Sequence, residues 1–190
     1  MAFSRTGELI AFINATTARD LNLNKHLNNV MELSTQIALV LRLPNESLEV
    51  VRRAALFHDI GKIKIAHEIL YKTGALSSGE WEQLKLHPTQ GSDLLEQRFK
   101  KAKLPGLDQV ISAVRHHHEA YDGSGYPGRL CGREIPLASR IIAIADSYDA
   151  MTTSRPYRKA VSGSEAIKEI IRCAGTQFDP KLVAAFIRIF

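Results

Sequence analysis

The sequence predicts an all-α domain, and three observations support this fold class. Apolar residues recur at three- and four-residue spacing along most of the chain, the pattern of one buried helix face. Two capping-box motifs, at residues 77–80 and 162–165, mark the starts of helices. No alternating run of β-branched residues is bounded by turns, so strands are not expected. We therefore expect an all-α domain with at least six helices.

The N-terminal half of the pattern predicts two helices that meet at a proline. A helix is expected over residues 25–43, where apolar side chains share one face, and Pro44 ends it. Asn45 or Ser47 is then placed to cap a second helix. The apolar face of that helix leads directly to His58, which places an imidazole at the end of a buried stripe.

The next predicted helices lie on either side of an irregular loop. The capping box at residues 77–80 begins a helix that runs through Trp81, and a further helix is expected over residues 107–118. Prolines and glycines then punctuate residues 119–136, which predicts a loop and leaves a small hairpin open. A strongly apolar helix is expected to follow over residues 137–151.

Two more helices are expected at the C-terminal end. The second capping box begins one of them, and Gly175 is expected to close it. Asp179 followed by Pro180 is typical of a helix cap and the first helical residue.

Length and composition exclude several classes of protein. The 190 residues are 45% hydrophobic and 24% charged, which suits a single domain over residues 1–190 and excludes a disordered chain. No apolar run reaches the roughly 18 residues of a membrane span, and two cysteines make no disulfide framework, so a cytoplasmic location is expected. The net charge of +5 hints at an anionic ligand but is spread along the chain, which disfavours DNA binding.

Histidine followed by aspartate at positions 58 and 59 forms the first candidate site. Adjacent His and Asp side chains can place a nitrogen and an oxygen on a pair of metal ions, with the carboxylate as the bridge. Lys62, on a continuing helix, would face the same way and suits a phosphate oxygen. His58 alone would fit a structural histidine at a helix end, but Asp59 and Lys62 together favour a functional site.

The three successive histidines at residues 116–118 form the second candidate site. Neighbours on a helix point about 100° apart, so at most two of the three can enter one site. Neutral imidazoles suit Zn, Fe, Mn or Ni. A solvated turn is the alternative, but the position of the run after an apolar helix favours metal ligands.

Three isolated residues add to these two candidates. His26 lies near the start of the first expected helix, and His87 is expected late in the helix after Trp81, directly before a proline. Either one alone would more often be structural. Asp146 interrupts an apolar helix, where an unpaired carboxylate would cost several kcal/mol. It should therefore bind a cation or, alternatively, pair with an arginine.

Together these positions provide seven nitrogen and oxygen ligands: His26, His58, Asp59, His87, two of the histidine run, and Asp146. Seven ligands with one bridging carboxylate suit two metal ions about 3.5–4 Å apart, an arrangement that supports hydrolysis at phosphorus. Neither cysteine has ligand spacing, so structural zinc is not expected. The sequence also lacks nucleophile motifs and phosphate-binding glycine loops, which again favours metal-based hydrolysis.

At these residues the sequence resembles the HD superfamily of metal-dependent phosphohydrolases, and within it the HD-GYP family of bacterial cyclic-dinucleotide phosphodiesterases. The matching motifs are LFHDIGKI at residues 56–63, HHE at 117–119, DGSGYP at 122–127, IP at 135–136, ADSYDA at 145–150, RPYR at 155–158 and FDP at 178–180. The resemblance extends over about residues 15–190. It implies an HD-domain helical bundle.

The resemblance also implies roles for individual residues. It maps the metal ligands to His26, His58, Asp59, His87, His117, His118 and Asp146. It maps the substrate contacts to Lys62, Tyr126, Asp149, Arg155 and Arg158. Asp59 is implied as the bridging carboxylate and, with Lys62, as a catalytic residue, while Asp149 would accept from a guanine edge. His67 and His116 have no ligand counterpart in the family.

Four positions depart from the family pattern, and one of them is Arg129, which stands directly before Leu130 where the family usually has a glycine. A glutamate that binds a third metal in some members is Asn22 here, so two divalent metals are expected, with iron or manganese favoured over nickel or zinc. The usual arginine three residues after the first histidine is Asn29, and the basic residue after the HHE motif is Ala120. None of these departures removes an expected metal ligand.

The activity implied by the resemblance is hydrolysis of cyclic di-GMP to linear pGpG, and onward to GMP, by a hydroxide that bridges two metals. The alternatives are another cyclic dinucleotide such as cyclic GMP-AMP, and a weakly active module that senses cyclic dinucleotides. The Gly-Tyr-Pro loop disfavours a dNTP or ppGpp. No DNA partner or membrane insertion is expected. A regulatory domain or signalling partner and a homodimer are compatible with the sequence.

Overall fold

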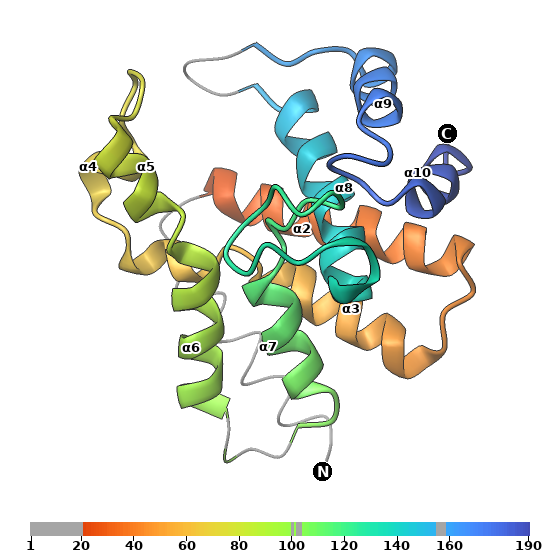
Figure 1. Cartoon of the computed structure of the whole chain (residues 1–190), viewed down its shortest axis with the longest axis horizontal. Helices are drawn as coiled ribbons and strands as arrows, with labels where there is room; N and C mark the ends of the chain where they lie inside the picture. The colour runs from red at the N-terminus through yellow and green to blue at the C-terminus, as the bar shows by residue number, and fades with distance from the viewer. Residues whose placement is uncertain (1–20, 100, 102–103, 155–158) are drawn as a thin grey trace.

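A computed structural model of the chain describes residues 21–99, 101, 104–154 and 159–190, and these residues form an all-α fold (Figure 1). The helices are α2 Leu21–Val40, α3 Asn45–Phe57, α4 His67–Leu70, α5 Ser78–Leu84, α6 His87–Phe99, α7 Leu107–Arg115, α8 Leu137–Thr152, α9 Gly163–Arg172 and α10 Pro180–Ile187, with 3-10 turns η1 Ile60–Lys64 and η3 Gly132–Glu134. In this part of the chain no strand forms, and the only β-type pairing is an isolated bridge between Ala174 and Phe178. The predicted fold class is confirmed.

The core forms where α2, α3 and α8 pack together near the middle of the molecule (Figure 1). α7 packs on α3 and α6, and α6 in turn packs on η1. The interior is filled by large side chains such as Ile37, Phe57, Ile141 and Phe186, all fully buried. Each such side chain contributes roughly 1.5–3 kcal/mol through burial. This packing fixes the ends of α3, α6 and α7 next to one face of α2 and α8.

Both predicted capping boxes are confirmed. At the start of α5, the Ser77 hydroxyl accepts from the Glu80 N–H, and the Glu80 carboxylate accepts from the Ser77 N–H. The same reciprocal pair opens α9. The cap expected at Asn45 or Ser47 is wrong, because α3 begins directly after Pro44 and no side chain caps it.

Several helix ends differ from the sequence expectation. The helix expected over residues 107–118 ends at Arg115, so the three histidines lie in the turn that follows it. The placement of His87 late in the helix after Trp81 is wrong, because α5 ends at Leu84 and His87 begins α6, a helix that the apolar pattern did not predict. α9 ends before Gly175, which adopts a left-handed conformation in the next turn (φ +88°).

Residues 119–136 form the expected irregular loop, and within it the structure shows η3 but not the small hairpin that was left open. The loop is held to the segment before α10, because the Tyr121 and Asp122 N–H groups donate to the carbonyls of Gln177 and Thr176. This anchoring fixes the position of the loop, whose Tyr126 ring stacks on His118.

The buried carboxylate of Asp179 ties the C-terminal helix to the core. One of its oxygens caps α10 by accepting from the Lys181 N–H, as the sequence predicted, and the other pairs with Arg140 of α8 at 2.6 Å. No helix among the described residues has the length and apolar character needed to cross a bilayer.

Candidate metal centre

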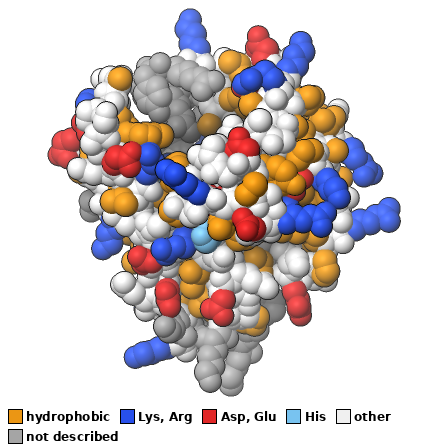
Figure 2. Space-filling model, in the orientation of Figure 1, with side chains coloured by type: hydrophobic (Ala, Val, Ile, Leu, Met, Phe, Trp, Pro, Cys, Tyr) orange, Lys and Arg blue, Asp and Glu red, His pale blue; other side chains and the backbone are white. Residues whose placement is uncertain are grey.

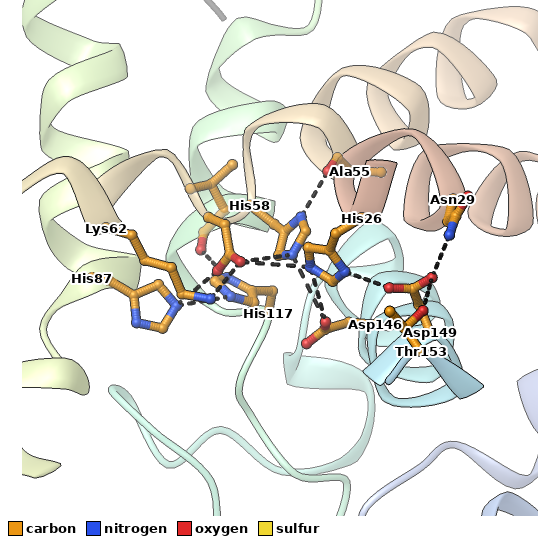
Figure 3. Close-up of polar contacts among 12 residues, drawn as sticks. His26, Asn29, Ala55, His58, Lys62, His87, His117, Asp146, Asp149 and Thr153 are labelled. Atoms are coloured by element: carbon orange, nitrogen blue, oxygen red, sulfur yellow. Dashed lines mark hydrogen bonds and ion pairs between the residues drawn. The ribbon is translucent and has the colours of Figure 1, made fainter. Parts of the chain in front are cut away.

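Side chains from five separate parts of the fold converge at one point (Figure 3). α2 provides His26, the end of α3 provides His58 and Asp59, α6 begins with His87, the turn after α7 provides His117 and His118, and α8 provides Asp146. Most of these residues are buried, and little histidine surface is visible in the space-filling view (Figure 2). All seven residues expected to ligate metal therefore lie in one place.

Six of the seven side chains divide into two groups. His87, His117 and His118 can each offer a ligand atom within 4.8 Å of the others, and His26, His58 and Asp146 do the same. Each group has the composition of a three-ligand site for a divalent cation.

Asp59 lies between these two groups. Its Oδ1 is 3.3 Å from His87 Nε2, whereas its Oδ2 is 3.6 Å from both His26 Nε2 and His58 Nε2. Each carboxylate oxygen thus faces a different group, the arrangement of a bridging ligand. Lys62 donates to the same Oδ2 at 2.5 Å and adds positive charge at the edge of the site.

Helix ends orient three of the histidines. His58, His87 and His117 lie one to three residues after the ends of α3, α5 and α7, where the final carbonyl groups have no intrahelical partner. The Nδ1 of each ring bonds the carbonyl oxygen three residues earlier, at 2.7 Å in all three cases. A ring that donates from Nδ1 presents an unprotonated Nε2, so all three rings can direct a lone pair into the site.

The site contains buried polar atoms that the protein alone does not satisfy. His58 Nε2 and Asp59 Oδ1 are inaccessible to solvent and have no hydrogen-bond partner among the residues that the structure describes. Such atoms are costly in a folded protein unless an ion or another partner meets them. His58 Nε2 belongs to one group and Asp59 Oδ1 faces the other, and both atoms are donors that suit a divalent transition metal.

The pKa values of the site residues match this chemistry. Burial lowers the pKa of His58 and His117, and it lowers that of His118 to about 4, so these rings are neutral at pH 7. Burial would raise the pKa of the Asp59 carboxyl, but the charge on Lys62 and the adjacent histidines hold it well below its usual range. Neutral imidazoles beside an ionised carboxylate are the forms that bind metal.

His26 has a different environment. Burial lowers its pKa, but hydrogen bonds to Asp149 and Asp59 and the charge on Asp146 raise it to about 9. A metal ion at this position would therefore have to displace a proton.

A stacked tyrosine covers one side of the site. The Tyr126 ring stacks on His118 with 5.0 Å between ring centres, and Lys85 Nζ lies 5.9 Å from the tyrosine ring centre. Burial and the nearby carboxylates of Asp59 and Asp146 raise the pKa of Tyr126, so it remains a neutral phenol.

Glu119 holds the tyrosine-bearing loop, a role that the sequence did not reveal. Its buried carboxylate accepts from the N–H groups of Gly128 and Leu130, at 2.6 and 3.1 Å. Gly125 is required at its position, since a Cβ there would lie 2.2 Å from the Ala120 nitrogen. In the sequence, the signal for this role was the position of Glu119 directly after the three histidines.

The remaining candidates lie as follows. Both oxygens of Asp149 are engaged, one with His26 and the other with Asn29 and Thr153. Asp146, for which an arginine partner was the alternative, pairs with His26 at 3.4 Å and lies 3.9 Å from Nε2 of the neutral His58 ring.

Two other histidines, His67 and His116, were expected to lie outside the metal site. His67 stacks on Tyr71, and His116 bonds back to the Ser112 carbonyl, so neither joins the two groups. Arg155 and Arg158 lie outside the described residues.

Comparison with known proteins agrees with this geometry. A family profile described as "HD domain" matches residues 11–182. The chain is 37% identical over 183 residues to a cyclic di-GMP phosphodiesterase of Thermotoga maritima, covering 96% of this chain and 49% of that protein. It is 35% identical over 170 residues to 3'3'-cGAMP-specific phosphodiesterase 2 of Vibrio cholerae serotype O1, covering 90% of this chain and 32% of that protein.

Solved structures show the same fold. An HDG"Y"P protein from Bdellovibrio bacteriovorus superimposes with a TM-score of 0.69 at 20% identity, over 88% of this chain and 52% of that one. The chain spans half or less of the length of the curated relatives described above. Because the matched profile covers nearly the whole sequence, the chain belongs to the HD domain family.

Proposed function

We propose that this chain is a two-metal phosphodiesterase that hydrolyses cyclic di-GMP. The observation that carries the proposal is the position of Asp59, with one carboxylate oxygen facing each group of histidines. The seven residues His26, His58, Asp59, His87, His117, His118 and Asp146 would hold the two cations. Iron and manganese fit the imidazole and carboxylate donors, as do nickel and zinc.

Two bound cations would supply an activated water and neutralise negative charge on the phosphate. In the reaction, a bond forms between the water oxygen and phosphorus, the bond from phosphorus to the 3′ oxygen breaks, and that oxygen gains a proton. The product of one such step on cyclic di-GMP is linear pGpG. A second hydrolysis would yield GMP.

The protein's own residues would bind and orient the substrate. Lys62, at the edge of the site, is placed to hold a non-bridging phosphate oxygen as a point charge. Tyr126 offers a ring face beside His118, where a nucleobase or sugar could pack. Arg155 and Arg158 are proposed as further phosphate contacts from the motif alone.

Cyclic GMP-AMP is the second candidate substrate. Relatives named as cyclic di-GMP phosphodiesterases and as 3'3'-cGAMP-specific phosphodiesterases match this chain at almost equal identity, 37% and 35%. The groups that surround phosphorus would be the same for either substrate, so the choice depends on contacts to the bases.

A turnover assay tests the proposal. Protein loaded with Mn²⁺ or Fe²⁺ under reducing conditions is incubated with cyclic di-GMP, cyclic GMP-AMP and ppGpp, and products are separated by chromatography. We expect pGpG from cyclic di-GMP and no product from ppGpp. Binding of cyclic dinucleotide without turnover by the metal-loaded protein would instead identify a sensor and overturn the proposed activity.

A further inference from the structure

The orientation of His26 depends on a side chain instead of a helix end. His58, His87 and His117 donate from Nδ1 to backbone carbonyls that belong to the fold itself. His26 Nδ1 instead contacts the carboxylate of Asp149 at 2.6 Å. This ring can therefore be turned by any change that moves Asp149.

Asp149 is in turn held by Asn29. Asn29 Nδ2 donates to Asp149 Oδ1 at 2.6 Å, whereas the Thr153 hydroxyl reaches the same oxygen at 3.3 Å (Figure 3). Asp149 is 5% exposed, and a buried carboxylate needs donors on both oxygens. Asn29 supplies the shorter of the two bonds to Oδ1.

The chain of contacts crosses the junction of α2 and α8. Asn29 lies one turn after His26 on α2, and Asp149 lies one turn after Asp146 on α8. α8 thus places one carboxylate at each nitrogen of His26, with Asp146 3.4 Å from Nε2 and Asp149 at Nδ1. A ring held in this way keeps Nδ1–H toward Asp149 and directs Nε2 toward Asp59 and Asp146, where a cation would replace the Nε2 proton.

We infer that Asn29 is a positioning residue for one of the two metal positions, acting through Asp149 on His26. The inference rests on the proposed two-metal function. The inference gives a role to Asn29, which stands where the HD-GYP family usually has an arginine. Outer-shell partners of ligating histidines typically change metal affinity by about 10–100-fold when removed.

Asn29 also borders a cleft of about 360 Å³ that Glu32, Gln36 and Thr152 help to line. Its removal therefore enlarges a space that already reaches solvent and leaves no sealed cavity. A variant at this position should therefore fold, so that its affinity for metal can be measured.

The test is a Mn²⁺ titration of the whole chain, with free Mn²⁺ counted by electron paramagnetic resonance. Wild-type protein is expected to bind two ions, and Asn29→Ala is expected to weaken one of the two binding steps by about 10–100-fold. Asn29→Asp keeps the shape but replaces the donor with a carboxylate facing Asp149, so it should weaken that step at least as much. Asn28→Ala, the exposed neighbour on the same helix, is the matched control and should bind like wild type.

The outcomes separate this inference from the proposed function. Two Mn²⁺ bound with wild-type affinity by both Asn29 variants would overturn the inference and leave the function standing. Normal binding by Asn29→Asp with weak binding by Asn29→Ala would show that Asn29 acts by filling space, which also overturns it. A wild-type protein that binds no Mn²⁺ would overturn both. Thermal unfolding in chelator checks that each variant is folded.

Discussion

Gly61 makes a close backbone contact beside the candidate metal centre, and its substitution tests how that contact positions His87. Gly61 is buried in η1 against the first turn of α6. A Cβ at this position would lie 1.9 Å from the His87 carbonyl oxygen and 2.6 Å from the Gly91 nitrogen. Both atoms belong to the backbone of α6, so neither can turn aside as a side chain could.

The magnitude of the Gly61→Ala effect follows from this overlap. Ordinary contacts begin near 3.4 Å, so η1 and the start of α6 must separate by about 1.5 Å. Overpacking of this kind costs about 1–3 kcal/mol of unfolding free energy. Because His87 begins α6, the shift moves its Nε2 away from Asp59, and a displacement of about 1 Å can reduce activity by about 100-fold.

The assay combines urea unfolding with Mn²⁺ affinity and turnover of cyclic di-GMP. We expect Gly61→Ala to lose stability, to weaken the metal position formed by His87, His117 and His118, and to lose most activity. Gly79→Ala in α5 is the matched control, since a Cβ there meets no atom within 4 Å. If Gly61→Ala matches wild type in stability and metal affinity, the close approach does not position His87 and the reasoning is refuted.

Three other substitutions test the loop, the phosphate contact and the fold separately. Glu119→Gln weakens two charge-assisted bonds to the tyrosine-bearing loop, so KM for cyclic di-GMP should rise roughly tenfold with metal content unchanged. An unchanged KM would contradict a positioning role for Glu119. Lys62→Met should lower kcat by about 100-fold while two metals remain bound, and a wild-type kcat would remove Lys62 from the reaction. Asp179→Ala leaves Arg140 without its buried partner and uncaps α10, so urea unfolding should show a loss of about 3 kcal/mol. A loss below about 1 kcal/mol would show that this pair does not stabilise the fold.

Sequence motifs predicted a helix start correctly where all of the residues in the motif lie within one turn. Both capping boxes and the Asp179 cap form because each needs only residues within one turn of each other. The cap at Asn45 or Ser47 fails because the polypeptide already enters α3 directly from Pro44. The helix over residues 87–99 lacked a strong apolar stripe, since part of its buried face is made of His87, Gly91 and Ser92.

The site could be predicted as a set of residues but not as a geometry. Helical spacing allowed at most two of the three histidines at residues 116–118 to enter one site. The structure places two there, but because α7 ends at Arg115, all three lie in the following turn, where the His116 ring bonds back to the Ser112 carbonyl. The contact of Asp149 with a guanine stays a prediction, and the structure adds that both of its oxygens bond partners on α2 and at the end of α8. Contacts between distant segments, such as His26 with Asp149, leave no trace in local spacing.

Metal content of protein purified without oxygen tests the two-metal arrangement most directly. Elemental analysis of the wild-type chain should give two equivalents of iron or manganese, and Asp59→Ala should lose both metals and turnover of cyclic di-GMP, because each group of histidines faces one oxygen of this carboxylate. Asp93→Ala, an exposed aspartate paired with Arg115, is the control and should match wild type. An Asp59→Ala protein with a single tightly bound metal and full activity would contradict the bridging role of Asp59 and the two-metal reaction.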